Sequence, residues 1–190
     1  MGTDLVIKYK RKEINIGRVD AYKINDKLVT NQDELDVYWA DVIDDLKKED
    51  VILKGANCVN LKSNKAGILI GHPKGGTILT ALQAVIGRRT KLIIPAGLEK
   101  RISDDVDSIE TQLNAPDAEG PRFLSVRGEI FTELQAIEYL YNVKASCVAA
   151  GGVYGAEGSV WINIQGEKGV CADVKDFLKD VAAEAPFGGC

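Results

Sequence analysis

A strand-like pattern of hydrophobic and polar residues opens the chain, and a helical pattern follows it. Within residues 5–30, the segments VDAYKI and KLVT are separated by Asn25 and Asp26, a pair typical of a hairpin turn. A helix is expected next, because Asn31 and Glu34 have the spacing of a capping box. Apolar residues then recur at helical spacing at Leu35, Trp39, Val42 (or Ile43) and Leu46.

Short apolar runs and helix-length segments alternate along the rest of the chain. The runs at 50–55 and 66–71 are rich in β-branched residues and end in glycine, as strands buried on both faces do. Further strands are predicted at 91–95, 122–126, 144–150 and 159–166. Helices are predicted at 77–86, 104–113, 129–141 and 172–183.

This alternation predicts the fold class. Strands that alternate with helices of about ten residues imply crossover connections and a mostly parallel sheet covered on both sides. We therefore predict an α/β fold, namely a Rossmann-like three-layer sandwich with a mostly parallel sheet and an N-terminal antiparallel hairpin. The 190 residues fit a single domain, 1–190, in which residues 1–30 form edge strands or a flap.

Charge and composition narrow the range of partners. The chain has 24 Lys and Arg against 28 Asp and Glu, which disfavours nucleic acid as the main partner. Its one basic cluster, KYKRK at 8–12, is interpreted as a solvated strand edge. No apolar run approaches the roughly 18 residues that span a membrane, and no signal-peptide pattern is seen, so a cytoplasmic protein without a membrane partner is expected. The four cysteines are widely scattered and favour neither disulfides nor a metal site.

Glycine-containing loops follow four of the predicted strands, at 55–57, 71–76, 95–101 and 151–158. In parallel sheets, ligands bind outside the carboxyl ends of the strands, so these loops are expected to meet on one rim. Glycine often only ends a strand, but it also lets the backbone approach a ligand closely. Gly151 and Gly152 are therefore candidate ligand-binding residues together with the loop at 71–76.

The stretch GHPKGGT, which precedes a predicted helix, is the best local candidate for an anion site. Lys74, Gly75, Gly76 and Thr77 offer flexible N–H groups, an ammonium and a hydroxyl at the positive end of that helix. The spacing is not that of a P-loop, and GGVYGAEG does not match a dinucleotide fingerprint. Neither a nucleoside triphosphate nor a dinucleotide is supported, and no cofactor is predicted.

Candidates for chemistry lie on the same predicted rim. Glu99 or Glu157 is the candidate general base, and His72, the one histidine, is the candidate general acid. Asn57 and Lys100 are expected to orient the ligand. The alternative for each is a structural or solvated role, as a turn-stabilising amide, a hydrogen-bonding histidine or a surface charge.

Residues 50–100 resemble a known superfamily. The segment DVILKGANCVNLKSNKAGILIGHPKGGTILTALQA is similar to the part of type A ribose-5-phosphate isomerase that has an acidic turn, a lysine before glycines and a helix glutamate. More broadly, it resembles the superfamily that also contains CoA transferases and translation-initiation-factor 2B-like proteins. The resemblance implies a three-layer α/β fold that binds sugar phosphates or related anions over its strand ends.

The matched positions keep the lysine but replace the carboxylates. The acid of the turn falls at Asn57, the lysine at Lys74, and the helix glutamate at or near Gln83. An aldose–ketose isomerisation needs a carboxylate base, which neither amide supplies.

Two hypotheses of different classes follow. The first is a protein that binds a small phosphorylated or carboxylated metabolite, with a sugar-phosphate isomerase-like or CoA-transferase-like enzyme as one form of it. The second is a non-catalytic regulatory or assembly domain of the same fold. A homo-oligomer is also expected, because few predicted helices cover the apolar residues of the N-terminal strands, Val6, Ile7, Ile14, Ile16 and Val19.

Overall fold

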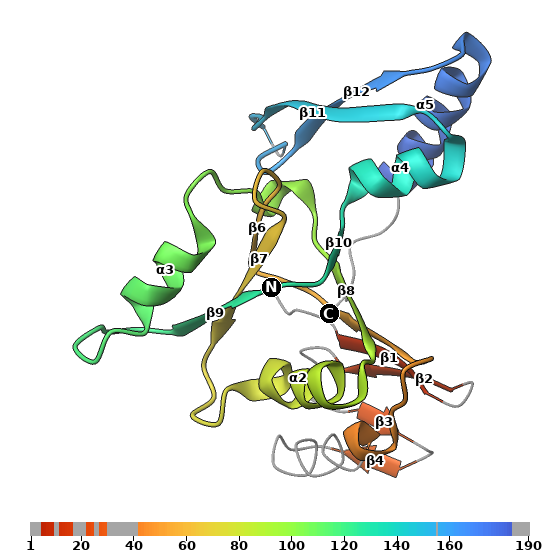
Figure 1. Ribbon diagram of the computed structural model, residues 1–190. Coiled ribbons are helices and arrows are strands. Elements are labelled where there is room, and N and C mark those ends of the chain that lie inside the picture. Colours follow the sequence, from red (N-terminus) through yellow and green to blue (C-terminus); the bar gives the residue numbers. More distant parts are fainter. Residues whose placement is uncertain are drawn as a thin grey trace. The chain divides into compact units, whose positions relative to one another are not determined.

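The computed structural model describes the backbone of four N-terminal strands, together with residues 42–154 and 156–183 (Figure 1). The chain divides into two compact units. The first unit comprises Met1–Ala96 and Lys100–Ile130, and the second comprises Gly97–Glu99 and Phe131–Cys190. Each unit has its own buried core.

A five-stranded sheet of order β10-β8-β5-β1-β2 includes the N-terminal strands β1 and β2. β5 pairs in parallel with β8 and antiparallel with β1, which pairs antiparallel with β2. The bounds are β1 (Leu5–Tyr9), β2 (Lys12–Ile16), β5 (Val51–Lys54), β8 (Lys91–Pro95) and β10 (Glu129–Phe131).

β3 (Tyr22–Ile24) and β4 (Lys27–Val29) form a separate antiparallel hairpin. Ile24 pairs with Lys27, which confirms the hairpin predicted around Asn25 and Asp26. Of the helix predicted over 31–46, residues 42–45 are helical, whereas Asn31, Glu34, Leu35 and Trp39 lie outside the described residues.

A three-stranded antiparallel sheet of order β6-β7-β9 carries the candidate site. Ile68 and Ile70 of β7 join the main core with the buried residues Ile78, Ala81 and Ala84 of α2. Phe123 of β9 instead packs with Cys58 and with Val106 of α3, which lies along β9 (Figure 1). The bounds are β6 (Cys58–Asn60), β7 (Lys65–Ile70), α2 (Gly76–Arg88), α3 (Val106–Leu113) and β9 (Arg122–Val126).

The predicted mostly parallel, Rossmann-like three-layer sandwich is wrong. The structure is mixed α/β with several small sheets, and β7 pairs antiparallel with both of its neighbours instead of joining β5. The physical reason is a tight reversal after β6. The Asn60 side-chain oxygen accepts hydrogen bonds from the N–H groups of Lys62 and Ser63, each at 3.0 Å, and Asn64 is left-handed at φ 53°.

The second unit is a two-stranded sheet covered by two helices. β11 (Lys144–Ala150) pairs antiparallel with β12 (Val160–Gln165), and one face of this hairpin packs on α4 (Glu133–Tyr141) and α5 (Lys168–Ala182). Thr132 begins α4 with a capping box that involves Gln135, so the helix starts later than the predicted 129. A short helix, η1 (Leu98–Lys100), begins in this unit, where the Leu98 N–H donates to the Glu133 carboxylate at 2.9 Å. Among the described helices, none combines the length and the apolarity needed to cross a bilayer.

Candidate anion-binding groove

The loop after β7 is a tight turn that begins at His72. The Gly75 N–H donates to the His72 carbonyl oxygen at 3.0 Å, and the Lys74 N–H donates to His72 Nδ1 at 3.2 Å. Gly75 and Gly76 have φ values of +84° and +63°, the left-handed region that favours glycine, and α2 begins at Gly76. Two N–H groups expected to cradle an anion are therefore engaged inside the turn.

An open groove of about 440 Å³ lies beside this turn and belongs entirely to the first unit. Its walls come from the end of β7, the turn, the start of α2, the end of α3 and the start of β9. The lining residues are Ile70, Pro73, Lys74, Gly75, Leu79, Asn114, Arg122, Phe123 and Leu124.

Two cationic side chains line the groove, and none of its nine lining residues is acidic. Lys74 and Arg122 are both exposed. Arg122 pairs with Ile70 across the sheet, and its Nη2 donates to the Gly71 carbonyl oxygen at 2.6 Å. This bond fixes the guanidinium beside the turn. Because a guanidinium has five N–H donors, others remain for an anion.

The amide of Asn114 is used inside the protein. Its Nδ2 donates to the Phe123 carbonyl oxygen at 2.7 Å, and its Oδ1 accepts from the Phe123 N–H at 3.0 Å. The side chain therefore ties the end of α3 to β9 and supplies shape to the groove. The remaining side chains in the lining are apolar.

Asn57, Thr77 and Lys100 belong to the first unit but do not line this groove. The Oδ1 of Asn57 accepts from the Leu69 N–H at 2.9 Å, and its N–H donates to the Gly67 carbonyl oxygen at 2.9 Å. It therefore holds the chain against β7. Gln83, where the resemblance places the helix glutamate, is exposed on α2.

The other predicted residues, Glu99, Glu157, Gly151 and Gly152, belong to the second unit. Gly151 and Gly152 start the connection between the paired strands β11 and β12, and the Gly151 N–H donates to the Ser159 carbonyl oxygen at 2.9 Å. The expectation of one glycine-rich rim is wrong, because β7 and β11 lie in antiparallel sheets rather than in one parallel sheet. The individual roles of these residues stay predictions.

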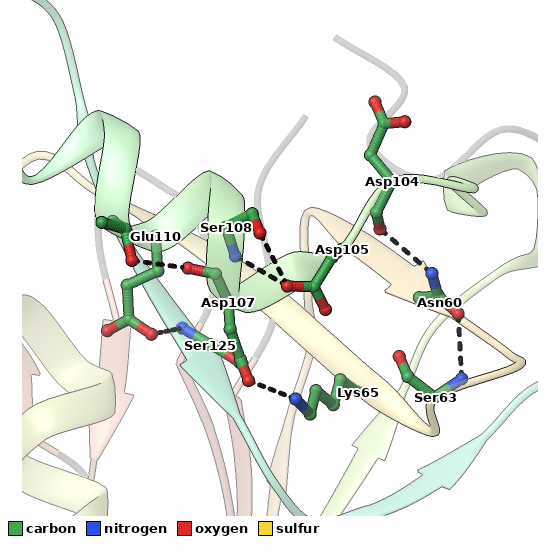
Figure 2. A network of polar contacts seen from close by, with 10 residues as sticks. Asn60, Ser63, Lys65, Asp104, Asp105, Asp107, Ser108, Glu110 and Ser125 are labelled. Carbon is green, nitrogen blue, oxygen red and sulfur yellow. Dashed lines mark hydrogen bonds and ion pairs between the residues drawn. The ribbon is translucent and has the colours of Figure 1, made fainter.

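The acidic start of α3 forms a second polar cluster, drawn in Figure 2. Asp105 caps the helix by accepting from the Ser108 N–H at 3.0 Å. Asp107 accepts from Lys65 and from the Ser125 hydroxyl, and Ser125 N–H donates to Glu110 at 3.2 Å. These carboxylates join α3 to β7 and β9, which is a structural role.

Lys74 and Gly75 are predicted from the sequence, whereas Arg122, Asn114 and the apolar lining are not. Arg122 opens a predicted strand, and nothing in the sequence shows that this strand lies beside β7 rather than elsewhere.

The chain matches no family model, no curated protein and no solved structure.

Proposed function

We propose that this protein binds a small phosphorylated or carboxylated metabolite in the groove beside the His72 turn. The observation that carries the proposal is the pair of exposed cations, Lys74 and Arg122, in a groove whose lining has no acidic residue. The chain as a whole is acidic, with a net charge of −4, so this local excess of positive charge is a contrast with its surroundings.

Each cation has a distinct role in the proposal. Arg122 is held by its bond to the Gly71 carbonyl oxygen and offers paired N–H groups, which suit the two oxygens of a carboxylate or phosphate. Lys74 adds an exposed ammonium from the turn. The resemblance of Lys74 to the lysine that precedes the glycines in sugar-phosphate isomerases is consistent with this role.

The proposal is one of binding and includes no reaction. The groove lining has no carboxylate, hydroxyl or thiol, and the predicted bases Glu99 and Glu157 belong to the second unit. A regulatory or assembly domain of the kind expected from the sequence would use the same groove without turnover. His72 as an acid stays a prediction.

Calorimetric titration with inorganic phosphate and with simple carboxylates tests the proposal. Lys74→Gln and Arg122→Gln should each weaken binding by about 1.5–3 kcal/mol, the range for hydrogen bonds to charged groups. Lys62→Gln is the matched control, because Lys62 is exposed in the same unit but does not line the groove. Equal affinity in Arg122→Gln and in the parent protein would reject the groove as the site.

A further inference from the structure

The neutral polar groups around the groove are already paired within the protein. The Asn114 amide is bonded on both sides to the Phe123 backbone, at 2.7 and 3.0 Å. The N–H groups of Lys74 and Gly75 are bonded to His72. Each of these bonds takes up a donor or an acceptor that a ligand hydroxyl would otherwise use to replace the water that it loses on binding.

The remaining lining is apolar. Ile70, Pro73, Leu79, Phe123 and Leu124 make up five of the nine lining residues, and Leu79 is 41% exposed. An apolar ligand surface placed against them would be removed from water at no cost in hydrogen bonds. A hydroxyl-bearing surface in the same place would lose its hydration without gaining a partner.

Both cations of the groove lie beside the loop that follows β7. Arg122 is tied to the carbonyl oxygen of Gly71, and Lys74 lies three residues further along the same turn. The groove therefore holds both cations beside this loop, and its apolar lining comes from β7, the loop, α2 and β9. Its volume of about 440 Å³ lies in the range typical of small-molecule sites.

We infer that the ligand is an anion with an apolar body, such as an aliphatic or aromatic carboxylate or phosphate ester, and not a sugar phosphate or another polyhydroxylated anion. This inference rests on the proposed function, because it assigns a chemical class to the ligand of the same groove. The anionic group binds beside Lys74 and Arg122, and the carbon skeleton lies on Leu79 and Leu124.

Matched pairs of probes test the inference by calorimetry or by chemical-shift titration of the full-length chain. Hexanoate and gluconate share a carboxylate and a six-carbon chain and differ in their hydroxyl groups. Phenyl phosphate and ribose 5-phosphate make the same comparison for phosphate esters. We expect the apolar member of each pair to bind at least tenfold more tightly than its hydroxylated counterpart. Hexanamide, which has no charge, should bind at least tenfold more weakly than hexanoate.

A matched pair of leucine variants locates the apolar contact. Leu79→Gln changes the groove lining, and Leu69→Gln changes a leucine of similar exposure, 44%, that lies outside the groove. Hexanoate affinity should fall severalfold in Leu79→Gln and stay at the parent value in Leu69→Gln. Thermal unfolding of both variants establishes that they are folded before titration.

The outcomes separate the two proposals. If gluconate binds as tightly as hexanoate, the apolar body is rejected while the anion-binding function stands. If no anion binds, the proposed function fails and the inference fails with it. If hexanamide equals hexanoate, charge recognition by Lys74 and Arg122 is rejected. Equal loss of hexanoate affinity in both leucine variants would also overturn the assignment of the apolar contact.

Discussion

The ring of Phe123 on β9 occupies the space where Gly67 of the neighbouring strand β7 would carry a side chain. A Cβ placed on Gly67 would overlap the end of the ring and would lie 2.6 Å from Cys58 Sγ. Phe123 is 4% exposed and belongs to the cluster beneath α3, so the ring has little freedom to move away. The absence of a side chain at Gly67 therefore allows the Phe123 ring to pack closely against β7.

Gly67→Ala should lower the free energy of unfolding by about 1–3 kcal/mol, the usual cost of overpacking a core. Gly71→Ala is the control, because nothing lies within 4 Å of a Cβ at Gly71, which directly follows the same strand. Urea unfolding of both variants measures the difference. A Gly67→Ala protein as stable as the parent would show that the ring can move.

Gly75 and Gly76, at the start of α2, should differ in how much an alanine substitution destabilises the protein. Both are left-handed, which costs an alanine about 1–2 kcal/mol, but a Cβ on Gly75 would also collide with the Leu79 side chain. At Gly76 the nearest atom is His72 Cβ at 3.9 Å. Gly75→Ala should therefore be the more destabilising change in thermal unfolding. Leu79→Ala in the same chain should restore part of the loss, and failure of this rescue would reject the collision with Leu79.

Asn60 is expected to matter far more for stability than Asn57. Asn60 is 6% exposed, and its Nδ2 donates to the carbonyl oxygens of Ser103 and Asp104 at 3.3 and 3.0 Å. Its Oδ1 accepts two further bonds in the turn after β6. Asn60→Ala should lower the free energy of unfolding by about 1–3 kcal/mol or more, because it leaves buried groups without hydrogen-bond partners. Asn57→Ala removes the bond of an exposed side chain and should cost less in the same unfolding assay.

Lys65 and Asp107 should make stability depend on pH in the acidic range. Hydrogen bonds from Lys65 and then from Ser125 hold the pKa of the Asp107 carboxyl below its ordinary value. A lowered pKa adds stability above the unfolded-state pKa, about 3.9, and that contribution is lost as the pH falls through the lower folded-state pKa.

Urea unfolding at a series of pH values tests this contribution. The stability difference between the parent and Lys65→Met should be largest near neutral pH and should shrink as the pH falls below about 4. Asp107→Asn provides the control, since adding Lys65→Met to it should have an effect that is nearly constant over that range. A pH-independent difference between the parent and Lys65→Met would contradict the role of this ion pair.

The cysteines should differ in reactivity. Burial raises the pKa of the Cys58 thiol, which packs beneath Phe123, whereas Cys147 and Cys171 are partly exposed. Because the thiolate is the reactive form, iodoacetamide should modify Cys147 and Cys171 in the native protein and Cys58 only after unfolding. Mass spectrometry of peptides from native and urea-treated protein measures this. The test is made in a Cys190→Ser variant, since Cys190 lies outside the described residues. Rapid native modification of Cys58 would contradict its burial.

The homo-oligomer expected from the sequence stays a prediction. Light scattering at high micromolar concentration should give at least twice the mass of one chain, and the mass of a single chain at that concentration would reject it. The side chains of Val6, Ile7, Ile14, Ile16 and Val19, on which the expectation rests, lie outside the described residues.

Local sequence patterns predicted most of the elements but not their partners. β8 and β9 have the predicted bounds, and α2 extends the predicted helix by a few residues, because each is a continuous apolar or periodic run. β6, a strand of three residues, is too short to be recognised by periodicity. The connection at 151–158 is shorter than the dozen or so residues that a parallel crossover needs, so a hairpin of β11 and β12 was foreseeable.

The candidate site was predictable only where it lies in one loop. Lys74 and Gly75 stand out in the sequence because glycines and a cation precede a helix. Arg122 lies in the same groove because it pairs with Ile70 in the sheet, and the two strands are far apart in the sequence. Such a register depends on the packing of the whole unit, which no local pattern encodes.

The groove draws its walls from both hydrophobic clusters of the first unit, since Leu124 packs against the main core and Phe123 belongs to the cluster under α3. A ligand bound there would stabilise both clusters, because the unfolding of either cluster would remove part of its binding site. A free ligand concentration of one hundred times the dissociation constant would raise the free energy of unfolding of this unit by about 2.7 kcal/mol. The amount of folded protein in a cell would then rise with the concentration of the ligand, because the bound protein unfolds less often and is degraded more slowly.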